Sequence, residues 1–288
     1  MNRRITEWNG RGEKKLKELI KIEFERAFKN KMFVFSIIIG VLIAGIHTYN
    51  YVWTDRNAIE EVLGYGKYSS VQITGLYMKW MGTETSAYSF LYYFVMPLLT
   101  ALPYSVSILM DTRKHYVNNV FIRIDKKKYY KVKLLTQFVV GGVIAAFPLL
   151  LSLIVSAMII PAFKPVATTS QYMLDKSFVF GDLFYDKPLL VAIIVILFAF
   201  VGFGLINCIA YIFADLINNR FMVALTPFIV YFLYYILCYS VKRDGPMEYI
   251  KGSRLRWQEF GYMIMDIVIL VILIAASYFV RSRRKDTV

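Results

Sequence analysis

Long apolar runs alternate with short polar segments along this chain of 288 residues. Six runs carry almost no charge, and each is close to or longer than the ~20 residues that a helix needs to cross a ~30 Å hydrocarbon core. They cover residues 32–53, 88–110, 134–161, 188–213, 222–241 and 261–280. The cores of water-soluble proteins do not need runs of this length. The pattern therefore predicts an all-α polytopic membrane protein with six transmembrane helices.

The composition agrees with a membrane protein, because 58% of the residues are hydrophobic, against about 45–50% in ordinary globular chains. The net charge of +14 would suit nucleic acid only if a folded soluble surface carried it. Little chain remains outside the six runs, so we exclude nucleic acid as a partner. The basic residues are expected to report topology and contact with anionic headgroups of the lipid bilayer.

The segments between the runs differ in their content of Lys and Arg. Alternate segments, counted from the N-terminus, hold 23 of these residues, and the remaining segments hold 11. Because basic residues concentrate on the cytoplasmic side of a membrane, both termini are predicted to be cytoplasmic. The chain then divides into a cytoplasmic N-terminus (1–31), a six-span membrane domain (32–280) and a cytoplasmic basic tail (281–288). The predicted outer segment 242–260 holds five basic residues, more than the rule favours.

Apolar residues recur at helical spacing before the first run, and most of the lysines there fall elsewhere on the helical wheel. The apolar positions are Leu16, Leu19, Ile20, Phe24, Ala27 and Phe28. The spacing predicts an amphipathic helix that lies in the cytoplasmic membrane interface, with its cations near anionic lipid. An ordinary helix packed on a soluble partner is the alternative interpretation.

The segment from Asp111 to Lys133 is strongly charged, yet it holds five apolar residues near its centre. These are Val117, Val120, Phe121, Ile122 and Ile124. A merely solvated turn does not require so many, so we expect a short helix whose apolar side faces another protein. A positive anchor that touches only lipid headgroups remains the alternative.

Prolines interrupt three of the predicted spans. Pro97 and Pro103 lie in the second, Pro148 in the third and Pro227 in the fifth. Each removes a helical hydrogen bond and permits a kink or a broken helix. Moving transporters use such breaks, and static membrane proteins contain them too.

The residues needed for several kinds of chemistry are missing. The two histidines, His47 and His115, are predicted on opposite sides of the membrane, so they do not form a metal-binding pair. No Gly-x-x-x-x-Gly-Lys-Ser/Thr motif occurs, so the chain has no phosphate-binding loop of the common ATPase type. Cys208 and Cys238 lie inside predicted spans, where buried and inert thiols are expected. The chain itself is therefore not expected to be an enzyme, to bind a metal or to hold a cofactor.

Two features inside the predicted spans are candidates for function. Asp266 is an acid within the sixth span, and intramembrane ionisable groups are costly enough to suggest a role; a position at headgroup level is the alternative. The fifth span carries aromatic residues at spacings of three and four, which could line a path for an amphipathic substrate or serve only helix packing. They are Phe228, Tyr231, Phe232, Tyr235 and Tyr239.

Several local phrases, in order, resemble the membrane (permease) subunit of bacterial type 2 ABC exporters. They are YYFVMPLLTALPY over residues 92–104, Asp111 with Arg113 and Lys114, Arg123, YYKVK over residues 129–133, and Val140-Gly141-Gly142. The order of the parts is also similar. An amphipathic helix comes first, six spans follow, a charged segment lies after the second span, and there is no ATP site. The resemblance is strongest from Trp80 to Pro161. The outer loops do not match permeases that handle polysaccharide.

The resemblance implies an interface helix over Leu16 to Asn30 and a coupling helix over roughly Tyr116 to Ile124 that enters a groove of an ATPase subunit. It also implies location in the bacterial plasma membrane, ATP and Mg held by the partner ATPase, and a second permease subunit, either an identical chain or a homologue. The transport path would lie between the two membrane halves, near the first, second and fifth spans.

We therefore expect the transmembrane subunit of an ATP-driven exporter. The aromatic fifth span favours an amphipathic or hydrophobic substrate, such as an antimicrobial peptide, a lipid or a drug. The alternative is a non-transporting membrane anchor or regulatory subunit that recruits a cytoplasmic ATPase or sensor.

Overall fold

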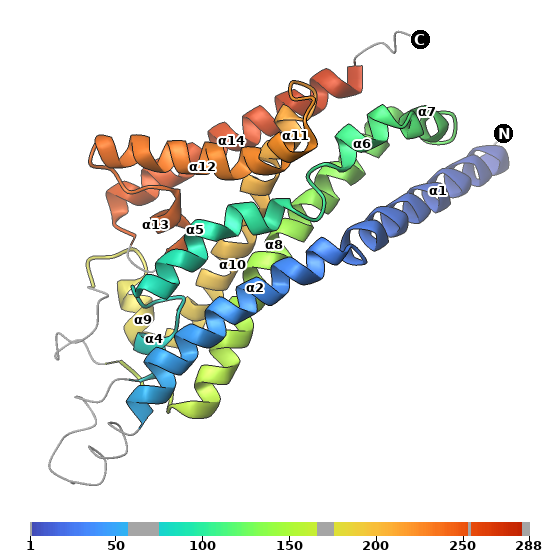
Figure 1. Ribbon diagram of the computed structural model, residues 1–288. Coiled ribbons are helices and arrows are strands. Elements are labelled where there is room, and N and C mark those ends of the chain that lie inside the picture. The colour runs from blue at the N-terminus through green and yellow to red at the C-terminus, as the bar shows by residue number, and fades with distance from the viewer. Residues whose placement is uncertain (1, 57–74, 166–175, 253–254, 284–288) are drawn as a thin grey trace, which may run out of the picture.

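The computed structural model describes residues 2–56, 75–165, 176–252 and 255–283, with side chains from residue 15 onward. Within these ranges the secondary structure is helical, apart from one isolated antiparallel bridge between Phe178 and Arg256. The basic tail expected over 281–288 is described only as far as Arg283, which ends the last helix. The chain is thus an all-α protein (Figure 1).

The helices follow one another in a simple order along the chain. They are α1 (Asn2–Phe28), α2 (Lys31–His47), η1 (Thr48–Trp53), α4 (Leu76–Lys79), α5 (Ala87–Ala101), α6 (Ser107–Arg113), α7 (Tyr116–Phe121), α8 (Lys126–Ile159), α9 (Gly181–Asp186), α10 (Pro188–Asn207), α11 (Ile209–Phe213), α12 (Arg220–Ser240), α13 (Pro246–Lys251) and α14 (Trp257–Arg283).

Five helical stretches are long and apolar enough to cross a membrane. They are α2 continued by η1, α8, α10 continued by α11, α12, and α14. These stretches make the chain a multi-pass membrane protein by length and composition. They correspond to all of the predicted spans except the second.

The second predicted span is broken into two helices rather than continuous. α5 has 15 residues, which is about 22 Å at 1.5 Å per residue, less than a ~30 Å hydrocarbon core. The chain then turns at Leu102–Val106 and continues as α6. Pro103 lies in this turn, where its missing N–H and its ring disfavour a continuous helix. Pro97, Pro148 and Pro227, by contrast, lie inside helices that continue past them.

α8 is the central helix and has 34 residues. It begins eight residues before the predicted span, where the Asp125 carboxylate accepts a hydrogen bond from the Lys127 N–H and caps the first turn. It packs closely on α10, because a Cβ placed on Gly141 would lie 2.8 Å from the Asn207 Cβ and one on Gly204 would lie 2.8 Å from the Phe138 carbonyl oxygen. Only glycine permits this approach at these two positions.

Buried amides reinforce the α8–α10 contact. The Asn207 side chain donates to the Gln137 carbonyl at 2.8 Å, and the Gln137 side chain donates to the Asn207 carbonyl at 2.7 Å. The Ser105 hydroxyl, in the turn between α5 and α6, donates to the Asn207 Oδ1 at 2.9 Å. These bonds satisfy polar groups that would otherwise be costly in an apolar interior.

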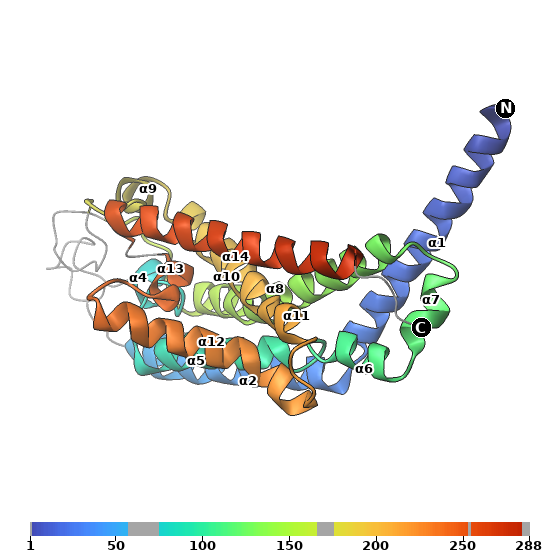
Figure 2. The ribbon, with the colours of Figure 1, turned by 90° about the horizontal axis from the view of Figure 1, so that it is seen from above.

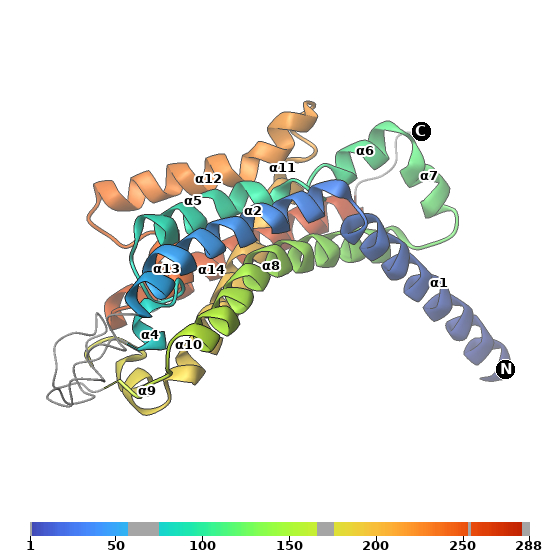
Figure 3. The same ribbon diagram turned by 60° about the horizontal axis from the view of Figure 1, so that its bottom comes forward.

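The arrangement of the helices places two faces on opposite sides of α8 and α10. α2, α5 and α12 lie side by side along one face, and α14 lies along the other (Figure 2). α1 extends away from the bundle, and it lies at the same end as α6, α7 and the end of α14 (Figures 1 and 3). The short helices α4, α9 and α13 lie at the opposite end.

Candidate functional site

Four charged side chains meet at the end of the bundle from which α1 projects. We define the charge cluster as Glu23 and Arg26 of α1, Asp111 of α6 and Lys133 of α8. Glu23, Asp111 and Lys133 are buried. Two carboxylates face two cations, so the cluster carries no net charge.

Lys133 joins the two carboxylates of the charge cluster. Its Nζ lies 2.8 Å from Glu23 Oε2 and 2.6 Å from Asp111 Oδ2. Arg26 forms a forked pair with Asp111, with contacts of 2.9 and 2.7 Å. Such a bidentate pair fixes orientation as well as distance. α1 is thereby held in one geometry with α6 and α8, which come much later in the sequence.

Two tyrosines complete the environment of the cluster. The Tyr104 hydroxyl donates to Glu23 Oε2 at 2.6 Å, and the Tyr129 hydroxyl donates to Asp111 Oδ2 at 2.8 Å. The Lys133 ammonium also lies 5.1 Å from the Tyr104 ring centre and 5.5 Å from that of Tyr129, within cation–π range. The buried charges therefore have polar partners on several sides.

The ionisation of Asp111 follows from these neighbours. Burial alone would raise the pKa of its carboxyl, because burial penalises the charged form. Hydrogen bonds and charge from Arg26 and Lys133 outweigh burial and hold the pKa below its ordinary value. Asp111 is therefore ionised at neutral pH, and its contribution to stability is lost only as the pH falls below the ordinary carboxyl range and through the lowered pKa.

An apolar layer lies beside the charge cluster. Leu19 of α1 packs against Val117 and Val120 of α7 and against Tyr129 and Val132 of α8, and all five are buried. Leu16 and Ile20 are half-buried against the same group. The apolar face of the predicted amphipathic helix is therefore at least partly covered by α7 and α8, and the observed helix ends at Phe28 rather than Asn30.

The remaining predicted interface residues lie toward α2. Phe24 and Phe28 stack at 5.9 Å between ring centres, and Phe28 meets Phe33 of α2 edge-on at 4.8 Å. Asn30 separates the two helices: its side-chain oxygen caps α2 at the Met32 N–H, and its amide donates to the Pro103 carbonyl at 2.6 Å. α1 is thus tied to the α5–α6 turn as well as to α7 and α8.

The six residues expected in the coupling helix occupy two environments. Val117 and Val120 are buried against α1, and Phe121 and Ile124 are half-buried in the same apolar group. Tyr116 and Ile122 are exposed, and Ile122 has 85% of its surface accessible. The helix itself covers Tyr116–Phe121, so Ile122 follows directly after its last turn.

The aromatic stripe of the fifth predicted span lies mainly against α5. The Tyr231 hydroxyl donates to the Tyr93 carbonyl of α5 at 3.2 Å and is buried. Phe228 and Phe232 both meet Phe94 of α5 edge-on, at 5.4 and 5.7 Å. Most of the stripe therefore packs α12 on α5, and Phe232 remains partly exposed at this contact. Tyr235 lies against Gly245, and Tyr239 is exposed.

Asp266 has a partner that sequence reasoning missed. Arg243 donates to its Oδ2 at 2.8 Å and to the Tyr249 hydroxyl at 3.0 Å, and it stacks over the Tyr262 ring at 4.3 Å. The left-handed backbone of Lys242 (φ 53°) turns the chain so that the Arg243 N–H caps α12 at the Cys238 carbonyl.

The predicted outer segment 242–260 is more basic than the positive-inside rule favours, and two of its cations have internal partners. Arg243 pairs with Asp266, and Lys251 donates to the Ser89 hydroxyl at 3.0 Å and to the Glu84 carbonyl. Cations that serve such contacts are poor reporters of membrane orientation. The excess in this segment therefore has a structural cause.

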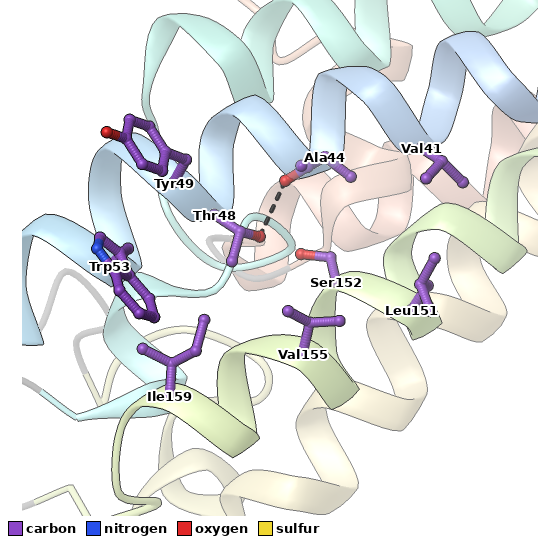
Figure 4. A pocket seen from close by; sticks show the side chains of 10 residues that line it. Val41, Ala44, Thr48, Tyr49, Trp53, Leu151, Ser152, Val155 and Ile159 are labelled. Carbon is purple, nitrogen blue, oxygen red and sulfur yellow. Dashed lines mark hydrogen bonds between the residues drawn. The ribbon is translucent and has the colours of Figure 1, made fainter.

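A small cavity of about 270 Å³ lies between η1 with the adjoining end of α2 and the last turns of α8 (Figure 4). The Thr48 hydroxyl beside it donates to the Ala44 carbonyl at 2.9 Å. The Ser152 hydroxyl points toward it from α8 and has no hydrogen-bond partner among the described residues. Tyr49 and Trp53 flank it, and none of the described residues that line it is charged, so these residues offer mainly apolar contact.

Comparisons with known proteins do not help to interpret this geometry. No family model, curated protein or solved structure matched the chain. The likeness to exporter membrane subunits therefore depends on the sequence phrases between Tyr92 and Gly142. The function has to be inferred from the residues themselves.

Sequence reasoning missed the charge cluster, although one signal for it was present. Glu23 lies four residues after Leu19 and four before Ala27, so it falls within the apolar stripe of α1. An acid at such a position indicates a buried partner. Its partner Lys133, and Asp111 on the other side of Lys133, appeared in the sequence only as members of a charged loop. The burial of Lys133 depends on α8 beginning earlier than its apolar run.

Proposed function

We propose that this chain is the membrane subunit of an ATP-driven exporter of the type 2 ABC class. The observation that supports it best is the joining of α1, α6, α7 and α8 by the charge cluster and its apolar layer. These elements form one connected unit at one end of the bundle. The unit carries the exposed Tyr116 and Ile122 at its surface, as a contact for a separate ATPase requires.

The connected unit suggests how a movement driven by ATP hydrolysis in a partner would be transmitted to the membrane helices. A push on α7 acts on α1 through Leu19 and on α6 and α8 through Asp111 and Lys133. Because bidentate and buried ion pairs keep their geometry, the unit would move as one body, as in other rigid-body transitions. The turn at Pro103 separates this unit from α5, and we propose that it acts as the hinge.

Six crossings with both termini in the cytoplasm remain our proposal for the topology. Contact between α1, which precedes α2, and α7, which follows α5 and α6, supports it. The chain leaves this end of the bundle along α2 and returns to it along α5 and α6. α5 and α6 together have the length that α5 alone lacks.

The path for the substrate would lie along the face formed by α2, α5 and α12, against a second membrane subunit. The partly exposed aromatic contact of Phe94 with Phe228 and Phe232 favours an amphipathic or hydrophobic substrate, such as an antimicrobial peptide, a lipid or a drug. The second subunit would be an identical chain or a homologue, and ATP with Mg would bind to the ATPase.

The first test is replacement of Ile122 by Asp, combined with purification of the tagged chain from its native membranes. The unchanged chain is expected to retain a stoichiometric subunit that carries a phosphate-binding loop and hydrolyses ATP. An aspartate at this exposed apolar site should release that subunit or reduce substrate-stimulated hydrolysis by about tenfold, which corresponds to about 1.4 kcal/mol. Ile122 is preferable to Phe121, which packs on Tyr129 and Tyr130 and whose loss would disturb α7 itself.

Leu216→Asp is the matched control. Leu216 is an exposed apolar residue, 74% accessible, in the turn between α11 and α12 at the same end of the bundle. It should leave ATPase retention unchanged. Equal behaviour of the two variants would contradict the role of α7, and a retained ATPase with no transported substrate would favour the regulatory alternative.

A further inference from the structure

A larger cavity, of about 470 Å³, lies between α10, α12, α13 and α14. Its walls are apolar almost throughout, and the polar side chains that reach it belong to Tyr234, Tyr249 and Asp266. The apolar lining includes Leu197, Val201, Leu205, Ile267, Leu270 and Leu273. The volume falls within the range of about 300–1,000 Å³ that is usual for ligand pockets.

The cavity exists because α14 is fastened near its two ends. Toward one end, Asp266 pairs with Arg243 at 2.8 Å, and Met263 is buried against Tyr249 and Leu255. At the other end, Arg281 lies 3.1 Å from Asp215 Oδ2 and stacks over the Tyr211 ring of α11. Between these attachments α14 stands off from α10 and α12, and their side chains leave space.

The rim of the cavity faces the bilayer rather than water. Leu197 and Val201 of α10 and Leu273 of α14 line it and also expose between 42% and 53% of their surface. The outward residues of α14 are apolar over its middle turns, from Ile264 to Leu273. A ligand that enters here would come from hydrocarbon, so the bilayer itself supplies it.

We propose that this cavity binds the acyl chain of a membrane lipid, with the lipid headgroup at the end formed by Arg243 and Asp266. A flexible hydrocarbon chain restores the dispersion contacts that an empty apolar cavity lacks. A transmembrane helix does not fit, because an α-helix about 10 Å across with a pitch of 5.4 Å fills this volume in about one turn. The proposal goes beyond the transport function and does not depend on it.

The orientation follows from the position of the polar side chains. Asp266 and Tyr249 lie at one end, while Leu273, seven residues further along α14, is about 10 Å deeper by helical rise and is surrounded by apolar groups. The cationic Arg243, which pairs with Asp266 at this end, suits the phosphate oxygens of a lipid headgroup. The tail would therefore end near Leu273 and Leu205.

The test uses the purified full chain in nanodiscs that contain phospholipid with a photoreactive diazirine at the end of one acyl chain. After illumination, mass spectrometry should find label on Leu205 and Leu273 in about tenfold excess over Ile193 and Ile272. The latter two residues lie on α10 and α14, are exposed, and do not line the cavity. They report ordinary contact with bulk lipid.

Leu273→Trp fills the cavity from its rim, and Ile272→Trp adds the same side chain facing outward. The first variant should lower labelling at Leu205 about tenfold, and the second should leave it unchanged. Because Leu273 is half exposed, a tryptophan there leaves the α14 attachments intact, which the unfolding midpoint of each variant checks. Equal labelling of cavity and outward residues, or labelling at Leu205 that survives Leu273→Trp, would overturn the proposal.

Discussion

Lys133 is a fully buried cation whose ammonium group contacts two carboxylates and two tyrosine rings. Taking charges out of water is costly, and mutual attraction compensates only when the geometry is good. Removal of one partner from such a group leaves the others buried and uncompensated. The charge cluster therefore contributes little net stability as a whole, yet it is sensitive to the loss of any one member.

Lys133→Met should lower the free energy of unfolding by about 3–5 kcal/mol, the usual cost of breaking a buried ion pair. The physical reason is that Glu23 and Asp111 would remain buried with Arg26 as their one cation, so the cluster would carry one excess negative charge. The unfolding midpoint in mild detergent measures the effect. Limited proteolysis between α1 and α2 should accelerate in parallel, since α1 would be released.

Lys131→Met is the control for that substitution, because Lys131 is exposed and two residues away on the same helix. It should be close to neutral. The double variant Glu23→Gln with Lys133→Met should recover part of the loss, because it removes one charge of each sign. A Lys133→Met protein as stable as the Lys131→Met protein would show that the cluster is not coupled as described.

Periodicity located α1 and its apolar side because apolar spacing is a local property of the sequence. The pattern predicted that this side faces the membrane interface, and the structure buries Leu19 of that side against α7 and α8. The partners of Glu23 could not be predicted in the same way, because Lys133 lies 110 residues away and its contact depends on three helices meeting. Asp266, as an acid inside a predicted span, likewise indicated that it has a partner. That Arg243 is this partner depends on the turn at Lys242, which the sequence did not predict.

At the scale of elements, the contact of α8 with α10 depends on Gly141. The phrase Val140-Gly141-Gly142 contributes to the resemblance in the sequence, and the structure gives it a physical reason. A side chain at Gly141 would displace Asn207 and break its paired bonds with Gln137. The glycine therefore permits both the approach of the helices and the amide contact.

Gly141→Ala should reduce the free energy of unfolding by about 1–3 kcal/mol, the usual cost of overpacking a well-filled interior. Gly45→Ala on α2 is the matched control, because a Cβ at Gly45 meets nothing within 4 Å. The control should be neutral or slightly stabilising, since alanine favours a helix more than glycine does. Unfolding midpoints compare the two, and equal losses would contradict the close packing at Gly141.

The helices illustrate which parts of the fold a sequence can reveal. Runs of apolar residues located α2 with η1, α12 and α14 within a few residues, whereas α8 begins eight residues before its run. The same rule merged α5 and α6 into one span, because hydropathy does not register the turn between them. Pro103 predicts a possible break within that run, and the turn at this proline confirms it.

For the whole molecule, the number of crossings determines on which side α7 lies. If α5 and α6 complete a crossing, the segment between α6 and α7 faces the cytoplasm. If they do not, five crossings remain. With the N-terminus in the cytoplasm, that segment then faces outward, and Lys164 of the loop after α8 faces the cytoplasm. The two arrangements place His115 on opposite sides of the membrane.

In a chain whose two native cysteines are replaced by serine, His115→Cys should react with an impermeant maleimide only in inside-out vesicles. Lys164→Cys should react only from outside in intact cells and serves as the marker of orientation. Reaction of His115→Cys from outside in intact cells, with Lys164→Cys reactive only in inside-out vesicles, would contradict six crossings with cytoplasmic termini. His115 is suitable because it is exposed and lies between two helices.

The charge cluster also has a consequence for the synthesis of the protein on the ribosome. Glu23 and Arg26 are synthesised first, and Lys133 follows 110 residues after Glu23. At about 5–20 residues per second, this leaves Glu23 without its Lys133 partner for about 5–20 s. α1 therefore cannot dock until the chain has extended into α8, by which time α2 and α5 have already been made. The cluster can therefore be completed only after the first half of the chain has been made as far as α8.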